Sequence, residues 1–535
     1  MPTSANIIAR YLSEAGVKRA FGIPGGEVLA VIDALADHDI EFTLVKHENA
    51  GGFMAEGTHY ASGAPGVLIA TLGPGVANAI NFIANAHQDR VPVLFITGCV
   101  DDKEAMTYTH QIFDHQALLA PITKASIKVA DGAVEESIDK ALSIAMDEPP
   151  GPVHVDIPIS VSTSMQIERT AVKRCKPHYG MPCTDDMKAI RAAIEIAKRP
   201  IAIAGIGVLQ QRAENELASF LLAHDIPLIT SYKAKGIISE DHPLSLGATG
   251  LSPKSEGVLL PLVKQADLVL LFGYDPIEMR PGWRNVWENN SRVIELSTLV
   301  NTHYMHHSNL HLYCDLKTTL PALTMPDAND IKPWPGGEIA AVQQANIAAF
   351  QSNDTWGPHV ICNIARQVLP DNAIATVDTG AHRILLSQLW VCKKARSLFQ
   401  STGLCTMGVA VPMALGYKMA QPDTHVVAFT GDAGMEMVLG DLATVRDSGL
   451  PIIIVIFVDE SLALIELKQR SMQLDNVGVD FESTDFVSIG KAYGFHSTWI
   501  GNADHYATEL EAALERNITT LLACRFPQQA YDGAF

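Results

Sequence analysis

Short apolar runs alternate with helical stretches along most of the chain. In the first segment, about 1–165, they lie at Phe42–Val45, Gly66–Thr71, Pro92–Thr97 and Pro152–Ile157. In the second, about 185–325, they lie at Pro200–Ala204, Pro227–Thr230 and Leu268–Phe272. Such alternation predicts parallel sheets with helices on both faces. The third segment, 355–535, repeats it, so we predict an α/β protein of three doubly wound parallel-sheet domains. Linkers are expected at the Pro/Gly-rich breaks 166–184 and 324–337.

The most informative stretch spans residues 426–461. Val426–Thr430 and Pro451–Val458 predict buried strands, and Met435–Ser448 predicts a helix that ends at Gly449. Asp432 lies in the small-residue turn after the first strand, and Asp459 follows the second. Because parallel strands end at one edge of a sheet, the two carboxylates are expected to meet there. The turn can also present backbone N–H groups to a phosphate.

Two interpretations of these aspartates remain open on the residues alone. Mg²⁺ prefers oxygen ligands, usually one or two carboxylates together with substrate phosphates and water. A bound diphosphate beside Asp432 and Asp459 would need such a cation. In a plain βαβ unit, Asp432 would instead cap the helix and Asp459 would be a turn residue.

Composition narrows the class of protein. The chain has 535 residues, of which 47% are hydrophobic and 18% charged, as is typical of a globular protein. Its net charge of −20 argues against nucleic acid or an anionic membrane as partner. No apolar run is long enough for a membrane span, and residues 1–17 predict an amphipathic helix with Ser4 near its cap, not a signal peptide. Eight cysteines without a CxxC pair favour a reducing compartment, so we expect a cytoplasmic protein.

The stretch 426–461 resembles the thiamine diphosphate signature, a Gly-Asp-Gly turn followed by an asparagine pair. Here Ala433 replaces the second glycine of the turn, as in acetolactate synthases, and Val458-Asp459 replaces the asparagine pair. The resemblance implies Mg²⁺ ligands at Asp432, Asp459 and the Ser461 backbone carbonyl. Ala433 and Gly434 would belong to the same cofactor-binding turn.

Glu48, in the run VKHENAGG, follows an apolar strand and opens a helix. An acidic residue there also favours the helix dipole and needs no catalytic role. The resemblance instead makes Glu48 the catalytic residue that hydrogen-bonds the aminopyrimidine ring and promotes its imino tautomer. FGIPGG and TLGPGVAN are similar to acetolactate synthase loops, which implies that Pro24 and Asn78 line the pyrimidine site.

Further motifs match in the third segment. The run Gly380-Ala381-His382 resembles a motif that contacts the diphosphate. GLCTMGVAVPMALG resembles the stretch whose bulky side chain bends the cofactor, here Met407, while the Cys405 carbonyl would accept a hydrogen bond from its amino group. On sequence alone, Met407 is more typical of a core side chain than of a residue that supports a cofactor.

The resemblance also implies a substrate site. In HQIFDHQALLAPITK, Gln111 matches a glutamine that reaches the neighbouring chain's active site, and His110 replaces a phenylalanine. In SLALIELKQR, Leu464 and Ile465 would form an apolar wall, and Lys468 takes the place of an acceptor-selecting tryptophan. Both His110 and Lys468 are also compatible with plain surface positions.

The central segment shows an incomplete dinucleotide motif, because Gln210 occupies the third glycine position after Gly205 and Gly207. Its run GYDPIE resembles catabolic acetolactate synthases, which work without FAD, so FAD is not expected. We therefore expect an acetolactate synthase-like enzyme that uses thiamine diphosphate and Mg²⁺. It would decarboxylate pyruvate or a related 2-oxo acid and ligate the resulting enamine to a second carbonyl.

Several alternatives stay open. They are a 2-oxo acid decarboxylase, an acyloin or aldehyde lyase, an FAD-dependent pyruvate oxidase and an inactive cofactor-binding paralogue. The resemblance further implies a homodimer or homotetramer with active sites between chains, acting on small 2-oxo acids or aldehydes.

Overall fold

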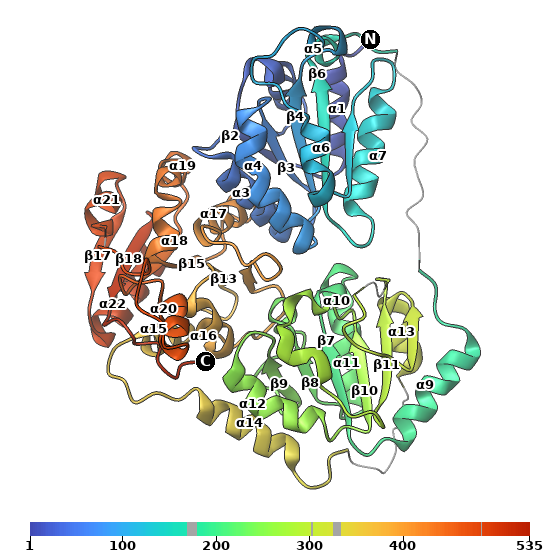
Figure 1. Cartoon of the computed structure of the whole chain (residues 1–535), viewed down its shortest axis with the longest axis vertical. Coiled ribbons are helices and arrows are strands. Elements are labelled where there is room, and N and C mark those ends of the chain that lie inside the picture. Colours follow the sequence, from blue (N-terminus) through green and yellow to red (C-terminus); the bar gives the residue numbers. More distant parts are fainter. Residues whose placement is uncertain (168–178, 301–302, 325–332, 483) are drawn as a thin grey trace.

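The structure is a computed structural model that describes residues 1–167, 179–300, 303–324, 333–482 and 484–535 (Figure 1). It contains three parallel six-stranded sheets with flanking helices, which confirms the predicted fold class. All seven predicted strands of the first two segments are present, with ends that shift by one or two residues. The two predicted linkers lie partly outside the described residues.

The first sheet has the strand order β2-β1-β3-β4-β6-β5. Its strands are β1 Arg19–Ile23, β2 Glu41–Leu44, β3 Gly66–Ala70, β4 Val93–Cys99, β5 Ala125–Lys128 and β6 Pro152–Pro158. Its helices are α1 Ser4–Glu14, α2 Leu29–Ala36, α3 Glu48–Ser62, α4 Pro74–Gln88, α5 Asp102–Ala105, α6 His115–Leu119, α7 Val134–Met146 and α8 Ile159–Thr163. Strands β3 and β4 are buried along their whole length and are apolar almost throughout rather than alternating. Strand β6 is equally buried but carries His154 and Asp156.

The second sheet has the order β12-β11-β10-β7-β8-β9. Its strands are β7 Pro200–Ala204, β8 Leu228–Thr230, β9 Ser245–Ala248, β10 Leu268–Phe272, β11 Arg292–Ser297 and β12 Leu310–Tyr313. The accompanying helices are α9 Thr184–Ile196, α10 Ile206–Gln210, α11 Glu214–Ala223, α12 Pro253–Val263 and α13 Leu316–Leu323. In Figure 1 this unit is green and lies beside both other units.

The third sheet has the order β14-β13-β15-β16-β18-β17. Its strands are β13 Ile374–Val377, β14 Leu398–Gln400, β15 Val426–Gly431, β16 Ile453–Val458, β17 His496–Ile500 and β18 Thr520–Arg525. The helices are α15 Pro358–Val368, α16 Ala381–Leu389, α17 Ala410–Ala420, α18 Asp432–Glu436, α19 Leu442–Ser448, α20 Ala463–Ser471, α21 Phe486–Ala492 and α22 Ala503–Glu515. Helix α14 Glu338–Ala349 precedes this unit and packs against α12 and β9 of the second unit.

One prediction in this unit is wrong. The single helix expected over Met435–Ser448 is instead two helices, α18 and α19, joined by a 3₁₀ turn at Leu439–Asp441. Val438 leaves the helical conformation with φ −126°. The Asp441 carboxylate accepts the Lys46 backbone N–H at 2.9 Å, so the break serves a contact with the first unit. Gly449 ends α19 with φ 65°, as expected.

The first and third units share one hydrophobic core, because helices α3 and α17 touch along their backbones. A Cβ on Gly57 would lie 2.2 Å from the Met413 carbonyl oxygen, and one on Gly416 would lie 1.9 Å from the Met54 carbonyl oxygen. Only glycine fits at either position without movement. Among the described residues, none of the helices combines the length and apolarity that crossing a membrane requires.

Candidate active site

The predicted pair of aspartates comes together at the carboxyl ends of neighbouring strands. β15 and β16 pair in parallel, with Gly431 opposite Phe457. Asp432 follows β15, and its Oδ2 atom accepts the backbone N–H groups of Asp459 at 3.2 Å and Glu460 at 2.8 Å. The side chains of Asp432 and Asp459 are both buried. Asp432 therefore fixes the start of the segment that carries Asp459.

Burial gives this pair unusual electrostatics. It raises the pKa of Asp432 to about 6. Burial together with the neighbouring Asp432 carboxylate raises the pKa of Asp459 to about 8. Among the described residues, no lysine, arginine or histidine forms an ion pair with either aspartate. Two buried carboxylates without a cationic partner fit a divalent cation that prefers oxygen ligands. A further oxygen, the backbone carbonyl of Ser461, lies two residues after Asp459.

A second feature beside the pair fits an anion. Gly380, whose backbone is extended, precedes α16, and Ala381 is its first residue. The buried Nε2 atom of His382 and the buried Thr379 hydroxyl have no hydrogen-bond partner among the described residues. The His382 ring stacks on Phe457 with centroids 5.2 Å apart. These orphaned polar atoms at a helix N-terminus suit the oxygens of a diphosphate.

Asp378 is a residue that sequence reasoning missed, although it lies just after β13. Its carboxylate accepts the N–H groups of Gly408 and Val409 and the Thr430 hydroxyl, each at 3.0 Å. A Cβ on Gly434 would lie 2.2 Å from its Oδ2 atom. Asp378 thus sets the distance between the Met407 loop and the turn that begins α18. The only signal was an acidic residue at a strand end, two positions before Gly380.

The Met407 loop, residues 401–409, connects β14 to α17. Met407 is half-buried, which leaves part of its side chain open for a bound molecule. Cys405 has φ 56°, a left-handed conformation that favours glycine. Its thiol donates to the Thr402 carbonyl at 3.2 Å and accepts from Arg383 Nη2 at 3.3 Å. A cysteine at this left-handed position introduces backbone strain that these contacts help to offset.

Glu48 opens α3 and is 3% exposed. Its Oε2 atom accepts a hydrogen bond from the Asn78 amide at 3.0 Å, so these two predicted residues lie together. A Cβ on Gly75 would lie 3.3 Å from Glu48 Oε1, which shows how closely the start of α4 approaches the carboxylate. Pro24 is exposed at the end of β1, at the same edge of the first sheet.

The sequence did not predict a buried polar network that contacts the loop containing Gly73, just before α4. His115 Nε2 accepts the Gly73 N–H at 3.2 Å, and Nδ1 lies 3.4 Å from Asp156 Oδ1. Thr97 donates to Asp156 at 2.8 Å and contacts His154 at 2.7 Å. The ligand atoms of His115, His154 and Asp156 lie within 4.8 Å of one another, as in a metal site. They are already hydrogen-bonded, so the cluster is a support for the Gly73 loop.

The predicted substrate residues are more open to solvent. His110 and Gln111 are exposed between α5 and α6, and Gln111 has φ 59°. The Gln111 backbone abuts Gly73, where a Cβ would meet its carbonyl oxygen at 2.5 Å. On α20, Ile465 is 43% exposed and Lys468 is exposed, whereas Leu464 packs against the third unit's core.

The structure thus builds two groups of predicted residues, one in the first unit and one in the third. Among the described residues, no hydrogen bond or ion pair joins Glu48 to either Asp432 or Asp459. One polar link between the two units runs through Asn81, which accepts the Thr406 hydroxyl at 3.0 Å and donates to Asn49 at 3.1 Å.

Comparison with known proteins gives three family models in chain order. They are the thiamine pyrophosphate enzyme N-terminal TPP binding domain at residues 2–118, the central domain at 187–323 and the C-terminal TPP binding domain at 378–524. Together the three models cover most of the chain, and each matches the unit built around one of the three sheets.

Curated relatives match almost end to end. Acetolactate synthase from Bacillus subtilis is 28% identical over 525 residues, covering 95% of this chain and 90% of the relative. The acetolactate synthase large subunit of Lactococcus lactis is 28% identical, covering 96% and 91%. A probable 2-ketoarginine decarboxylase from Pseudomonas aeruginosa is also 28% identical, covering 98% and 94%. The chain therefore belongs to the thiamine pyrophosphate enzyme family, in its acetolactate synthase-like group, and is a thiamine diphosphate-dependent enzyme of the transferase or lyase type.

Proposed function

We propose that the protein is a Mg²⁺-dependent carboligase similar to acetolactate synthases. It would decarboxylate pyruvate or a related 2-oxo acid and join the remaining fragment to a second carbonyl compound. The observation that carries this proposal is the buried pair of Asp432 and Asp459 beside the orphaned polar atoms of α16. The near full-length similarity to two acetolactate synthases supports it.

The residues of the third unit would hold the cofactor's charged end. Asp432, Asp459 and the Ser461 carbonyl would bind Mg²⁺, with the turn residues Ala433 and Gly434 beside them. Gly380, Ala381 and His382 would contact the diphosphate, while the Cys405 carbonyl and Met407 would hold the bent cofactor. When bound, thiamine diphosphate supplies the carbon nucleophile and the electron sink that decarboxylation requires.

Glu48 would handle the proton. Its buried carboxylate, fixed by the Asn78 amide, would hydrogen-bond the aminopyrimidine ring nitrogen, with Pro24 beside the ring. A positioned carboxylate of this kind contributes about 10²–10⁴-fold to a proton-transfer step. His115 would help to position Asn78 against Glu48, because it accepts the N–H of Gly73, the residue that precedes α4, and α4 carries Asn78.

Substrate residues and a partner chain complete the site in this proposal. His110, Gln111, Leu464, Ile465 and Lys468 would shape the acceptor pocket. We propose a homodimer or homotetramer with active sites between chains. Exposed apolar side chains on and after α20 support this: Ile465 is 43%, Met472 67%, Leu474 56% and Val477 72% exposed. Such a cluster is typical of a surface that another chain covers.

We further propose domain limits of 1–165, 185–325 and 355–535 and a cytoplasmic location. The three sheets lie within these limits. All seven cysteines in the described part of the chain are free thiols, as a reducing compartment permits. FAD has no part in the proposed reaction.

The test is incubation with thiamine diphosphate, Mg²⁺ and carbon-13 pyruvate, with NMR detection of the products. Acetolactate would support the proposal in donor, acceptor and bond formed. Pyruvate left intact, while a panel of other 2-oxo acids is also left intact, would contradict it.

A 2-oxo acid decarboxylase is the second candidate, because one near full-length relative is named a probable 2-ketoarginine decarboxylase. In that reaction the fragment left after loss of CO₂ is protonated and released as an aldehyde. An aldehyde as the sole product from pyruvate or another 2-oxo acid would favour this candidate over the carboligase.

A further inference from the structure

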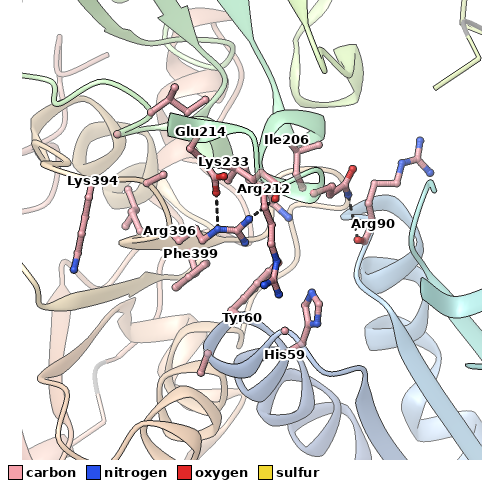
Figure 2. Close-up of a pocket in the computed structure, with 18 of the residues that line it drawn as sticks. His59, Tyr60, Arg90, Ile206, Arg212, Glu214, Lys233, Lys394, Arg396 and Phe399 are labelled. Carbon is pink, nitrogen blue, oxygen red and sulfur yellow. Dashed lines mark hydrogen bonds and ion pairs between the residues drawn. The ribbon is translucent and has the colours of Figure 1, made fainter. Parts of the chain in front are cut away.

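A large cavity lies away from the predicted active site. It has a volume of about 770 Å³ and lies where all three units meet (Figure 2). From the first unit it is lined by the end of α3 and by residues before β4 and β6. From the second it is lined by α10 and the start of α11, and from the third by the segment that leads into β14. Its size matches that of sites for small organic molecules.

Positive charge is concentrated around this cavity, although the whole chain carries −20. Six lysines and arginines line it, against three acids. The cations are Arg90, Arg212, Lys233, Lys393, Lys394 and Arg396, and the acids are Asp89, Glu148 and Glu214. Two of these cations pair with acids outside the lining, Arg90 with Asp275 and Lys393 with Asp241. Among the described residues, Arg212 and Lys394 have no carboxylate partner, and their charge attracts anions.

The acids on the cavity wall are largely neutralised. Asp89 lies 3.0 Å from Lys233 Nζ and accepts the Gly403 N–H at 2.7 Å. Glu214 pairs with Arg396 at 2.7 Å. Burial raises the pKa of Glu148 to about 7, so it carries less than a full negative charge at neutral pH. None of the three acids therefore cancels the charge of Arg212.

Arg212 is the cation best placed to bind a ligand. Among the described residues no carboxylate pairs with it. Its backbone has φ 53°, which turns the chain between α10 and α11. Figure 2 shows its side chain extending between Tyr60 and His59. A planar guanidinium with unused donors suits the paired oxygens of a phosphate group.

The cavity also offers apolar surface for an organic moiety. The Tyr60 and Phe399 rings stack in parallel with centroids 4.4 Å apart. Burial and the nearby Arg396 and Arg212 cations lower the pKa of His59 to about 4, so its ring is neutral at physiological pH. An inorganic ion would leave most of the volume and these rings unused.

We propose that this cavity is a second ligand site, distinct from the active site, for a small organic phosphate, with Arg212 as its main anion contact. The site is built from links between units: Asp89 holds Lys233 of the second and Gly403 of the third, Arg396 holds Glu214, and Arg90 pairs with Asp275 at 3.2 Å. A ligand there would brace all three units against one another. Binding would therefore raise the temperature of unfolding.

The test uses the full-length holoenzyme, saturated with thiamine diphosphate and Mg²⁺ so that the active site cannot take the probe. Ribose 5-phosphate, ADP, inorganic phosphate and citrate are titrated by calorimetry, and thermal unfolding is followed with each. We expect saturable binding of at least one organic phosphate, one molecule per chain, and a higher unfolding temperature. Binding of citrate alone would overturn the phosphate assignment, and binding of no probe would overturn the site.

Arg212→Gln is the decisive variant, because it removes the charge at an exposed side chain and keeps a polar, hydrogen-bonding group there. Affinity for the organic phosphate should fall about tenfold or more, and Arg212→Lys should recover part of it. Arg292→Gln, at an exposed arginine on β11 outside the cavity, is the matched control and should bind like the wild type. Equal affinity of the Arg212→Gln variant and the wild type would overturn the role of Arg212. The assay measures binding alone, so its outcome is independent of which reaction the enzyme catalyses.

Discussion

The Glu48 region and the Asp432 region both bury acid at the carboxyl edge of a parallel sheet, but they stabilise it in different ways. In the first unit a single carboxylate receives the Asn78 amide. The Gly73 loop rests on His115, which contacts Asp156, and Thr97 links Asp156 to His154. In the third unit, Asp432 and Asp459 lie close together, and Asp378 and Asp432 receive mainly backbone N–H groups. The first region rests on a hydrogen-bonded frame, and in the proposed function the second would bind a cation.

This difference separates two tasks. A lone carboxylate held by an amide can exchange a proton without disturbing its surroundings. Crowded carboxylates repel one another, so in the proposed function Asp432 and Asp459 would hold a divalent cation beside the diphosphate. Variants on the two sides should therefore fail in different assays.

Glu48→Ala should give the largest effect. We expect turnover to fall by about 10²–10⁴-fold, while affinity for thiamine diphosphate with Mg²⁺ changes little, because the proton-transfer group is lost and the diphosphate site is intact. Steady-state kinetics and calorimetric titration of the cofactor measure the two quantities. Glu14→Ala, at an exposed glutamate of α1, serves as the control. Near-normal turnover of Glu48→Ala would remove Glu48 from the mechanism.

Asp432→Ala should lose cofactor binding, which Glu48→Ala should keep. Loss of a metal ligand and of the anchor for Asp459 should weaken Mg²⁺-dependent cofactor binding by more than about 100-fold. Titration of the cofactor with Mg²⁺ and with EDTA should then give the same weak affinity. Asp475→Ala, an exposed residue in the same unit, should keep the wild-type response to Mg²⁺. An unchanged Mg²⁺ response in Asp432→Ala would contradict the proposed metal site.

The fold class could be predicted from the sequence where strands are continuous apolar runs, and the meeting of two site residues could be predicted from the order of the strands. Buried strands such as β3, β4 and β10 are continuous apolar runs and were predicted, whereas β12, whose residues are half-buried or exposed, has no such run and was missed. The parallel pairing of β15 and β16 made the meeting of Asp432 and Asp459 predictable from local order alone.

Contacts between distant segments could not be predicted in this way. The division of the α18–α19 region depends on Asp441 accepting Lys46 N–H, 395 residues away in the chain. The role of Asp378 depends on the Met407 loop folding back onto it, and the His115 network depends on three separate elements. No period or motif along the chain carries that information, because these hydrogen bonds are set by tertiary packing.

Acid should weaken the buried hydrogen-bonded network around His154 in the first unit. Burial lowers the pKa of His154 to about 4 from 6.5. The folded state thus binds this proton less readily than the unfolded state, so the contribution of His154 to stability is complete above pH 6.5 and is lost as the pH falls toward 4. The full loss is about 3 kcal/mol. Denaturant unfolding at several pH values should show a shallower fall between pH 6.5 and 4 for His154→Gln than for the wild type. Parallel curves would contradict the burial of a neutral imidazole.

Asp378→Asn should give the smallest effect, and it tests whether the carboxylates of the third unit act through charge alone. The amide keeps one acceptor oxygen but places an NH₂ group against a partner that donates, either the N–H groups of Gly408 and Val409 or the Thr430 hydroxyl. The free energy of unfolding should fall by about 1–3 kcal/mol, as measured by denaturant titration. Because Asp378 positions the Met407 loop and is not a proposed metal ligand, cofactor affinity should fall less than in Asp432→Ala and should stay Mg²⁺-dependent. Asp371→Asn, at an exposed aspartate before β13, controls for the loss of charge. If Asp378→Asn instead abolished the Mg²⁺ dependence, Asp378 would belong to the metal site, and the division between a positioning and a metal-binding carboxylate would be wrong.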